Sequence, residues 1–450
     1  MTTAHRIVIV GGVAAGLSAA MQARRRLPAS VVTVVDEGER ISRAACGTLF
    51  TAEDPDRPGD ESARMTSDRL RSERGIDLRL RHRVIAVDPE GRTVDAENID
   101  TGEREQLAFD ALVLATGASA APCSLPGAEL EGVSTLRRAT EAVAAHDDER
   151  AAAAVAVLGD DLRAVEVAGL AAAAGARVCL CSQRLLPGWL DGVRAVVADV
   201  LLAADIDLVD AAVTAIDGEE RVEAVVTDAG RRQVTLVVVV ADARPRTELA
   251  RSLGLRRGAT GAVWVNQYQE TSCDGIWAAG DCAEVFHRLL RRNVYQPGVT
   301  IAAKQGRIAG ANACSAKLRF RGAVGTRSVA VLGHEIARTG LGLEEARQEG
   351  FEPVAVVARQ RSRVSGHEGG SAVTIGLVAD GPSGLLLGAE LVAPEGAIAR
   401  AGILAAVLAA HGGVADLQAL DLAHAARLTP VWDPIQVAAN QLARKVDRAS

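Results

Sequence analysis

Aromatic residues and long apolar runs are scarce in this chain. Phe, Trp and Tyr supply only 2% of its 450 residues, whereas hydrophobic residues of all kinds supply 48%. The core must therefore be built from Ala, Val and Leu, and few rings remain to stack on nucleic-acid bases. No run of about eighteen uninterrupted apolar residues occurs, so the sequence predicts no membrane-spanning helix. A chain of this length is expected to form two or three domains.

An excess of positive charge is also missing. The chain has 50 Lys and Arg residues against 57 Asp and Glu residues, which gives a net charge of −7 and a pI near 5.7. Because no long basic run interrupts this balance, the sequence argues against a general nucleic-acid or anionic-membrane surface. The first residues lead directly into an apolar strand and a glycine turn, so we expect a cytoplasmic protein.

Paired cysteines are absent as well. The seven cysteines are Cys46, Cys123, Cys179, Cys181, Cys273, Cys282 and Cys314. They form no CxxC pair and show no metal-ligand spacing, and an odd number cannot pair completely. We therefore predict neither a disulfide scaffold nor a metal site. In a reducing compartment, one cysteine beside a cofactor turn is better explained as a reactive thiol.

Two strand, helix, strand units are present instead. Residues 6–10 form an apolar run that ends at a glycine pair, and a helical stretch and a second apolar run at 31–37 follow. The same pattern recurs at 155–159, 162–175 and 176–183. The sequence therefore predicts an α/β protein with two Rossmann-like folds.

The last part of the chain has another character. From residue 324 it reads as several strands followed by helices, which predicts a C-terminal α+β domain. Apolar strands at 109–119 and 275–282 end in small residues and belong to the first fold. We expect a discontinuous first domain, then a second and a third: 1–120 with 245–322, 121–244, and 324–450.

The turn GGVAAG at 11–16 is the first candidate cofactor site. Small residues between a strand and a helix let backbone N–H groups approach a pyrophosphate at the positive helix end. Asp36 ends the next strand, where a carboxylate can accept hydrogen bonds from a ribose diol. The alternative is a tight turn with a solvated Asp36.

Cys46 follows ten residues after that aspartate, in the segment ISRAACGTLF. A following helical turn lowers the pKa of such a thiol, which makes Cys46 the candidate nucleophile. The alternative is a small buried hydrophobic side chain.

Several motifs together resemble one family. They are GGVAAG, the spacing from Asp36 to Cys46, LATGA at 114–118, AAGDC at 278–282, KQGR at 304–307 and TPVWDP at 429–434. In these the chain resembles the single-cysteine, FAD-dependent pyridine nucleotide-disulfide oxidoreductases. That family includes the coenzyme A disulfide reductases, the persulfide reductases and the water-forming NADH oxidases, and the similarity covers nearly the whole chain.

The resemblance implies a glutathione-reductase-like fold and a set of site residues. FAD would be held by Gly11, Gly12, Ala15, Gly16, Asp36, Ala115, Thr116, Gly117, Gly280 and Asp281. A coenzyme A-like substrate would contact Ser18, Gln22, Arg25 and Ser42. The spacing of the first three places them on one helix face, although a solvated basic face explains Arg25 equally well.

The resemblance also implies a homodimer built through the C-terminal domain. In coenzyme A disulfide reductases, two tyrosines of the partner subunit reach the redox cysteine, and their positions fall on His367 and Leu428. His367 remains a candidate acid or base, with a surface histidine as the alternative. The asparagine that the family places before the cysteine is Ala45. The substrate is therefore not fixed as a coenzyme A disulfide.

The second nucleotide fold departs from the pattern. Its loop, GDDLRA at 159–164, carries Asp160 and Asp161 where the family has glycines, and carboxylates would repel a pyrophosphate. Asp242 replaces a further glycine of the family. Ser182, Gln183 and Arg184 stand where an NAD-binding fold has an acid, which favours the 2′-phosphate of NADPH.

We therefore predict an enzyme that uses FAD and Cys46 to act on a small thiol, disulfide or persulfide. NAD(P)H would be the donor, although the loop at 159–164 argues against it. Two alternatives remain: a nicotinamide-independent flavin oxidase or thiol dehydrogenase, and a flavin-bearing redox sensor without turnover.

Overall fold

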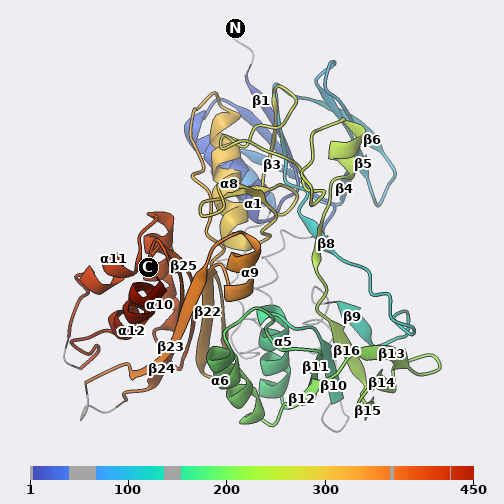
Figure 1. Ribbon diagram of the computed structural model, residues 1–450. Helices are drawn as coiled ribbons and strands as arrows, with labels where there is room; N and C mark the ends of the chain where they lie inside the picture. Colours follow the sequence, from blue (N-terminus) through green and yellow to red (C-terminus); the bar gives the residue numbers. More distant parts are fainter. Residues whose placement is uncertain (1–3, 40–66, 136–153, 365–368, 426, 450) are drawn as a thin grey trace. The chain divides into compact units, whose positions relative to one another are not determined.

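The computed structural model describes residues 4–39, 67–135, 154–364, 369–425 and 427–449. Contacts divide the chain into two compact units (Figure 1). One unit combines residues 1–121 with 242–323, and the other combines residues 122–241 with 324–450.

A five-stranded parallel sheet is the centre of the first unit. Two of its strands, Arg6–Val10 and Val31–Val35, are short apolar runs that are buried after their first residue. Their order is β18, β7, β1, β2, β3. The bounds are β1 (Arg6–Val10), β2 (Val31–Val35), β3 (Ile76–Arg79), β7 (Ala111–Leu114) and β18 (Ile276–Ala278).

Helices α1 (Ala14–Arg26) and α8 (Val299–Asn312) pack closely beside that sheet (Figure 1). Glycines make the approach possible: a Cβ on Gly306 would lie 2.0 Å from the Ala15 carbonyl oxygen, and one on Gly310 would lie 2.1 Å from that of Ala19. The unit also contains α3 (Ser67–Arg74), α7 (Glu248–Ser252), β4 (His82–Asp88), β5 (Thr93–Asn98), β6 (Arg104–Ala108), β8 (Ala118–Ala120), β17 (Ala243–Pro245), β19 (Val285–His287) and β20 (Arg292–Val294).

The second unit contains a second five-stranded parallel sheet, in the order β12, β11, β10, β16, β9. Its strands are β9 (Val133–Thr135), β10 (Ala154–Leu158), β11 (Arg177–Ser182), β12 (Asp207–Asp210) and β16 (Leu236–Val239). With it go α5 (Leu162–Ala173), α6 (Asp191–Leu202) and an antiparallel sheet of β13 (Val213–Asp217), β14 (Ala224–Thr227) and β15 (Gly230–Gln233).

The C-terminal part of the second unit is an antiparallel sheet with helices. The sheet runs β21, β22, β25, β24, β23. Its strands are β21 (Arg327–Val331), β22 (His334–Gly340), β23 (Pro353–Arg361), β24 (Ala372–Asp380) and β25 (Leu386–Ala393), and the helices are α9 (Leu343–Gln348), α10 (Ala397–Ala409), α11 (Val414–Ala419) and α12 (Pro434–Ala449). Helices α5 and α6 pack against this sheet.

The predicted α/β class, with two parallel-sheet folds and a strand-rich C-terminal part, is confirmed. The core is aliphatic, as the composition predicted: between α1 and α8, for example, it consists largely of alanine side chains. Contacts group the second fold with the C-terminal part in one unit. The domain limits at 121–244 and 324–450 stay a prediction. Among the described helices, none is long and apolar enough to cross a membrane.

Candidate active site

Four neighbouring strand ends meet at one edge of the first sheet. Val10 lies opposite both Val35 and Leu114, and Leu114 lies opposite Ala278. Because these strands are parallel, the residues that follow them share the carboxyl edge. That edge is where open α/β sheets bind ligands.

Glycines shape the turn from β1 into α1. Gly11 has a φ of +104°, and a Cβ there would lie 2.2 Å from the Ala115 carbonyl oxygen. A Cβ on Gly16 would lie 1.7 Å from the Gly11 carbonyl oxygen. Any side chain at either position would therefore displace the backbone. The turn brings the start of α1, with its free N–H groups, directly to the sheet edge.

Asp36 lies against this turn. Its carboxylate accepts the N–H of Gly12 at 2.6 Å and that of Gly38 at 2.8 Å. The half-buried side chain is thus bonded rather than simply solvated. Since a carboxylate has about four acceptor positions, the two that remain can accept hydroxyl groups of a ribose.

The other side of the edge is formed by the segment after β18. Gly280 has a φ of +81° and donates its N–H to the Gln305 side chain at 3.0 Å. Asp281 accepts the N–H of Gly298 at 2.9 Å, just before α8 begins, and burial raises the pKa of its carboxyl group. Gly117 has a φ of +72° and open space beside it. With an acceptor at each end and glycines between, the residues present fit FAD.

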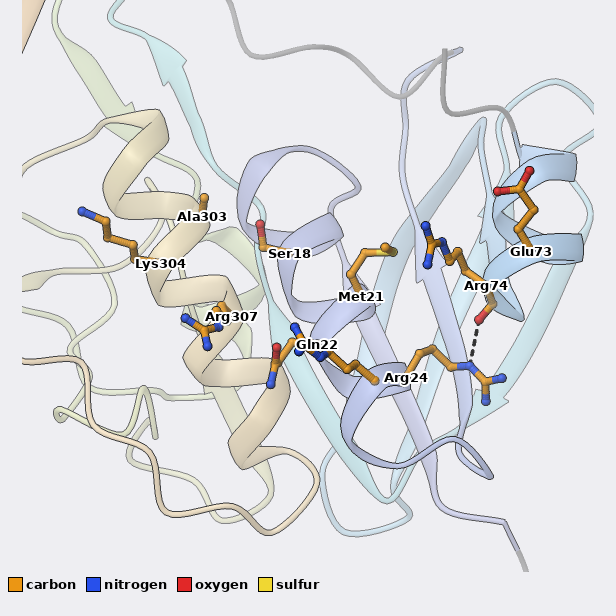
Figure 2. Close-up of a pocket in the computed structure, with 10 residues that line it drawn as sticks. Ser18, Met21, Gln22, Arg24, Glu73, Arg74, Ala303, Lys304 and Arg307 are labelled. Carbon is orange, nitrogen blue, oxygen red and sulfur yellow. Dashed lines mark hydrogen bonds between the residues drawn. The ribbon is translucent and has the colours of Figure 1, made fainter. Parts of the chain in front are cut away.

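A cavity of about 810 Å³ lies on the outer face of α1 (Figure 2). Helices α1, α3 and α8 provide its walls. It is lined by Ser18, Met21, Gln22, Arg24, Arg25, Glu73, Arg74, Ala303, Lys304 and Arg307. The structure thus brings Ser18, Gln22 and Arg25 together in one cavity.

Positive charge dominates this cavity. Glu73 is paired with Arg69 at 2.9 Å, and Arg24 donates to backbone oxygens of Arg74 and Ser30. Within the described residues, neither Arg25 nor Arg307 has a carboxylate partner. The cavity therefore suits a ligand with several anionic groups.

Lys304 and Arg307 belong to the KQGR motif, but the sequence predicted no role for these two side chains. Their spacing of three residues places both on one helix face, which was the available signal. It could not show which helix α8 packs against.

The second nucleotide fold is arranged differently at its helix start. Asp161 is the N-cap of α5, and its Oδ1 accepts the N–H of Arg163 at 2.8 Å and that of Ala164 at 3.2 Å. These are the groups that would otherwise face a dinucleotide pyrophosphate. The residues present therefore do not fit the pyrophosphate of NAD(P)H at α5.

Arg184 lies beyond β11 in the same unit. Its Nη2 is 3.5 Å from Asp191 Oδ1, and the side chain is largely exposed. The preference of this position for a 2′-phosphate stays a prediction.

Cys46, Ser42 and His367 lie outside the described residues, so their roles stay predictions. Among the described cysteines, Cys282 is fully buried and Cys314 is half-buried, and burial raises the pKa of both thiols. A raised pKa makes a thiol a poor nucleophile.

Comparison with known proteins gives consistent matches. The family model described as pyridine nucleotide-disulphide oxidoreductase matches residues 5–308. An NAD(P)H coenzyme A polysulfide/persulfide reductase of Pyrococcus horikoshii is 34% identical over 442 residues, which is 97% of this chain and 98% of that protein. An NAD(P)H sulfur oxidoreductase (CoA-dependent) of Pyrococcus abyssi is 34% identical over 441 residues, with the same coverage of both chains.

Solved structures agree. An NAD-dependent persulfide reductase from A. fulgidus superposes with a TM-score of 0.93 at 28% identity, covering 98% of this chain and 84% of that one. Reduced Bacillus anthracis CoADR-RHD superposes with a TM-score of 0.92 at 27% identity, covering 99% and 81%.

Proposed function

Because the chain belongs to the pyridine nucleotide-disulphide oxidoreductase family, we propose that it acts on the sulfur of a small coenzyme A-like disulfide, persulfide or thiol. The family is FAD-dependent, and the protein is an oxidoreductase. The cavity of about 810 Å³ beside α1 carries the proposal, because its Arg25 and Arg307 have no carboxylate partner among the described residues.

FAD would be held at the carboxyl edge of the first sheet. The N–H groups at the start of α1 would bind its pyrophosphate, and Asp36 and Asp281 would accept its hydroxyl groups. The complete set is Gly11, Gly12, Ala15, Gly16, Asp36, Ala115, Thr116, Gly117, Gly280 and Asp281. Bound FAD supplies a two-electron carrier for the redox thiol.

The substrate lies in the α1 cavity. Arg25 and Arg307 bind its phosphate groups, and Ser18 and Gln22 offer neutral hydrogen bonds. The volume falls within the usual range of ligand pockets, about 300–1,000 Å³. Ser42 completes the set, from the part of the chain outside the described residues.

Cys46 is the proposed nucleophile. Its thiolate attacks one substrate sulfur, an S–S bond forms to Cys46, and the other sulfur leaves as a thiolate. His367 supplies the proton that this leaving thiolate takes up. The proposed assembly is a homodimer, and the cytoplasmic location stays a prediction.

One observation favours a second candidate. Relatives are named for NAD(P)H, yet Asp161 already accepts the N–H groups at the start of α5. A nicotinamide-independent thiol oxidase would keep FAD, Cys46 and the α1 cavity, and would pass the two electrons of a thiol through FAD to oxygen or another acceptor.

A test of the sulfur chemistry needs no nicotinamide. The holoenzyme is reduced photochemically without oxygen, coenzyme A disulfide is added, and flavin reoxidation and thiol release are followed. We expect Cys46→Ser to keep its bound flavin and to lose both signals. Cys314→Ser, which removes a half-buried thiol, should behave like the wild type. Equal reoxidation rates in the Cys46→Ser and wild-type proteins would refute the thiol mechanism.

A further inference from the structure

Asp161 holds an unusual place for an acidic side chain in a nucleotide-type fold. The turn between β10 and α5 normally presents unpaired N–H groups to a phosphate. Here the backbone of Asp161 is extended, with a φ of −102° and a ψ of −178°, and the carboxylate folds over the helix start. One oxygen accepts two successive N–H groups, at 2.8 and 3.2 Å. A carboxylate of the chain itself therefore occupies the anion position.

Arg163 fixes the second oxygen of this carboxylate. Its Nε lies 2.7 Å and its Nη2 lies 2.6 Å from Asp161 Oδ2, so two guanidinium nitrogens donate to this single oxygen. Its Nη1 also donates to the carbonyl oxygen of Ala241 at 3.2 Å. The ion pair thus uses two of the donors that a guanidinium group can offer to a phosphate.

The first fold of the same chain shows the contrast. The N-cap of α1 is Val13, which has no side-chain hydrogen bond, and the first turn carries no acidic residue. The N–H groups of α1 stay available to an external anion, whereas two of those of α5 are taken. The local geometry is a strand, turn and helix in both places, so the difference lies in the side chain at the turn.

We infer that the Asp161 carboxylate occupies the phosphate position of the second fold. We also infer that Arg163, which now pairs with Asp161, would bind a phosphate if that carboxylate were absent. The chain as it stands takes no nicotinamide dinucleotide at α5. The inference rests on the proposed function, whose electron donor it concerns. It assigns Asp161 as the residue that prevents a dinucleotide from binding at α5 in this chain.

Without the Asp161 carboxylate, the position of Arg184 sets the preference of the α5 site between NADP⁺ and NAD⁺. This side chain lies just past the end of β11, is exposed, and makes a long contact of 3.5 Å to Asp191. Once Asp161 is removed, Arg184 and Ser182 favour a dinucleotide with a 2′-phosphate over one with a free diol.

The test is equilibrium binding of NAD⁺ and NADP⁺ to the holoenzyme by calorimetry. The oxidised dinucleotides give a binding signal without turnover. We expect no saturable binding by the wild type up to millimolar concentration. We expect Asp161→Gly to bind NADP⁺ at least tenfold more tightly than the wild type, and more tightly than NAD⁺. Adding Arg163→Ala to that variant should remove most of the gain.

Two further variants distinguish occupancy of the phosphate position by Asp161 from a general effect of negative charge and from loss of folding. Asp160→Asn removes the same charge one residue earlier and should bind like the wild type. Asp161→Asn keeps a good capping residue without the charge, and should bind more tightly than the wild type but less tightly than Asp161→Gly. It also serves as the test if Asp161→Gly loses its flavin.

The inference is overturned if Asp161→Gly and the wild type bind within threefold of each other, whether both bind tightly or neither does. Micromolar binding by the wild type overturns it as well. Since the coenzyme A disulfide test runs without any nicotinamide, its failure refutes the proposed function separately.

Discussion

Glu390 is a buried acid in the middle of β25, and it makes stability depend on pH. The residue is 1% exposed, its Oε2 accepts the N–H of Leu190 at 2.8 Å, and its Oε1 is buried without a hydrogen-bond partner among the described residues. Burial raises the pKa of this carboxyl group from 4.5 to about 7, while the N–H of Leu190 and the charge of Arg338 oppose the shift.

The direction of the effect follows from the two pKa values. Below pH 4.5 the carboxyl group is protonated in both the folded and the unfolded chain. Between pH 4.5 and about 7 the unfolded chain releases the proton and the folded chain keeps it, so the free energy of unfolding falls by about 1.4 kcal/mol per pH unit. Above pH 7 the accumulated loss is about 3 kcal/mol.

Glu390→Gln removes this titration and keeps an acceptor for Leu190. We expect the stability of the variant relative to the wild type to rise by about 2.5 kcal/mol between pH 5 and pH 8. Urea unfolding of the holoenzyme, followed by far-ultraviolet circular dichroism at several pH values, measures this difference.

Glu335→Gln is the matched control. Glu335 lies on β22 of the same sheet and also accepts a backbone N–H, that of Ile398 at 2.8 Å, but it is partly exposed. Its variant controls for the change from Glu to Gln at a partly exposed position of the same sheet. A Glu390→Gln stability difference that stays constant from pH 5 to pH 8 would refute the reasoning.

Two more predictions concern the first unit. Gly306→Ala should lower the amount of flavin bound per protein, because its Cβ would lie 2.0 Å from a backbone oxygen of α1. Gly402→Ala is the control, since a Cβ there would have nothing within 4 Å. Equal flavin content in the two variants would contradict the prediction. Arg307→Ala should raise the coenzyme A disulfide concentration that half-saturates reoxidation of the photoreduced flavin roughly tenfold, and should weaken its salt dependence, as expected for the loss of about 1.4 kcal/mol of charged contact. An unchanged half-saturating concentration would remove Arg307 from the substrate site.

The first nucleotide fold could be predicted from the sequence because each of its sequence motifs lies within a short segment. An apolar run, a glycine turn and a helical stretch lie in order along 6–26, and Asp36 follows at the end of the next strand. Glycine is required at Gly11 by a positive φ and at Gly16 by contact with the backbone. These constraints act over a few residues, so the sequence expresses them directly.

The α1 cavity was readable only in part. The spacing of Ser18, Gln22 and Arg25 places them on one face of a helix, and that inference needs no tertiary structure. The cationic residues of α8 reach the same cavity only because that helix packs on α1 through Gly306 and Gly310. Contacts between segments so distant in the chain leave no periodic pattern in the sequence.

Burial of Glu390 could not be predicted for a related reason. The strand Leu386–Ala393 is buried at all eight positions because helices cover both faces of the sheet: α6 lies on the face of Glu390, and α10 also contacts β25. An antiparallel strand is expected to alternate between core and solvent, and on that expectation Glu390 would be solvated. A single acid within an apolar run was the only sign that it is not.

The sequence predicted that Asp161 repels a pyrophosphate, but repulsion alone leaves the N–H groups of α5 free. The structure shows that the same carboxylate accepts them, and this changes the energetics. A dinucleotide that binds at α5 must displace an N-cap worth about 1 kcal/mol and break the ion pair with Arg163. It must also accept a like charge nearby. Since the proposed flavin edge and the α1 cavity lie within the first unit, the proposed exchange between Cys46 and the substrate needs no residue of α5. In the proposed function, the turn at Asp161 therefore decides whether electrons reach the flavin from a nicotinamide or from the thiol substrate itself.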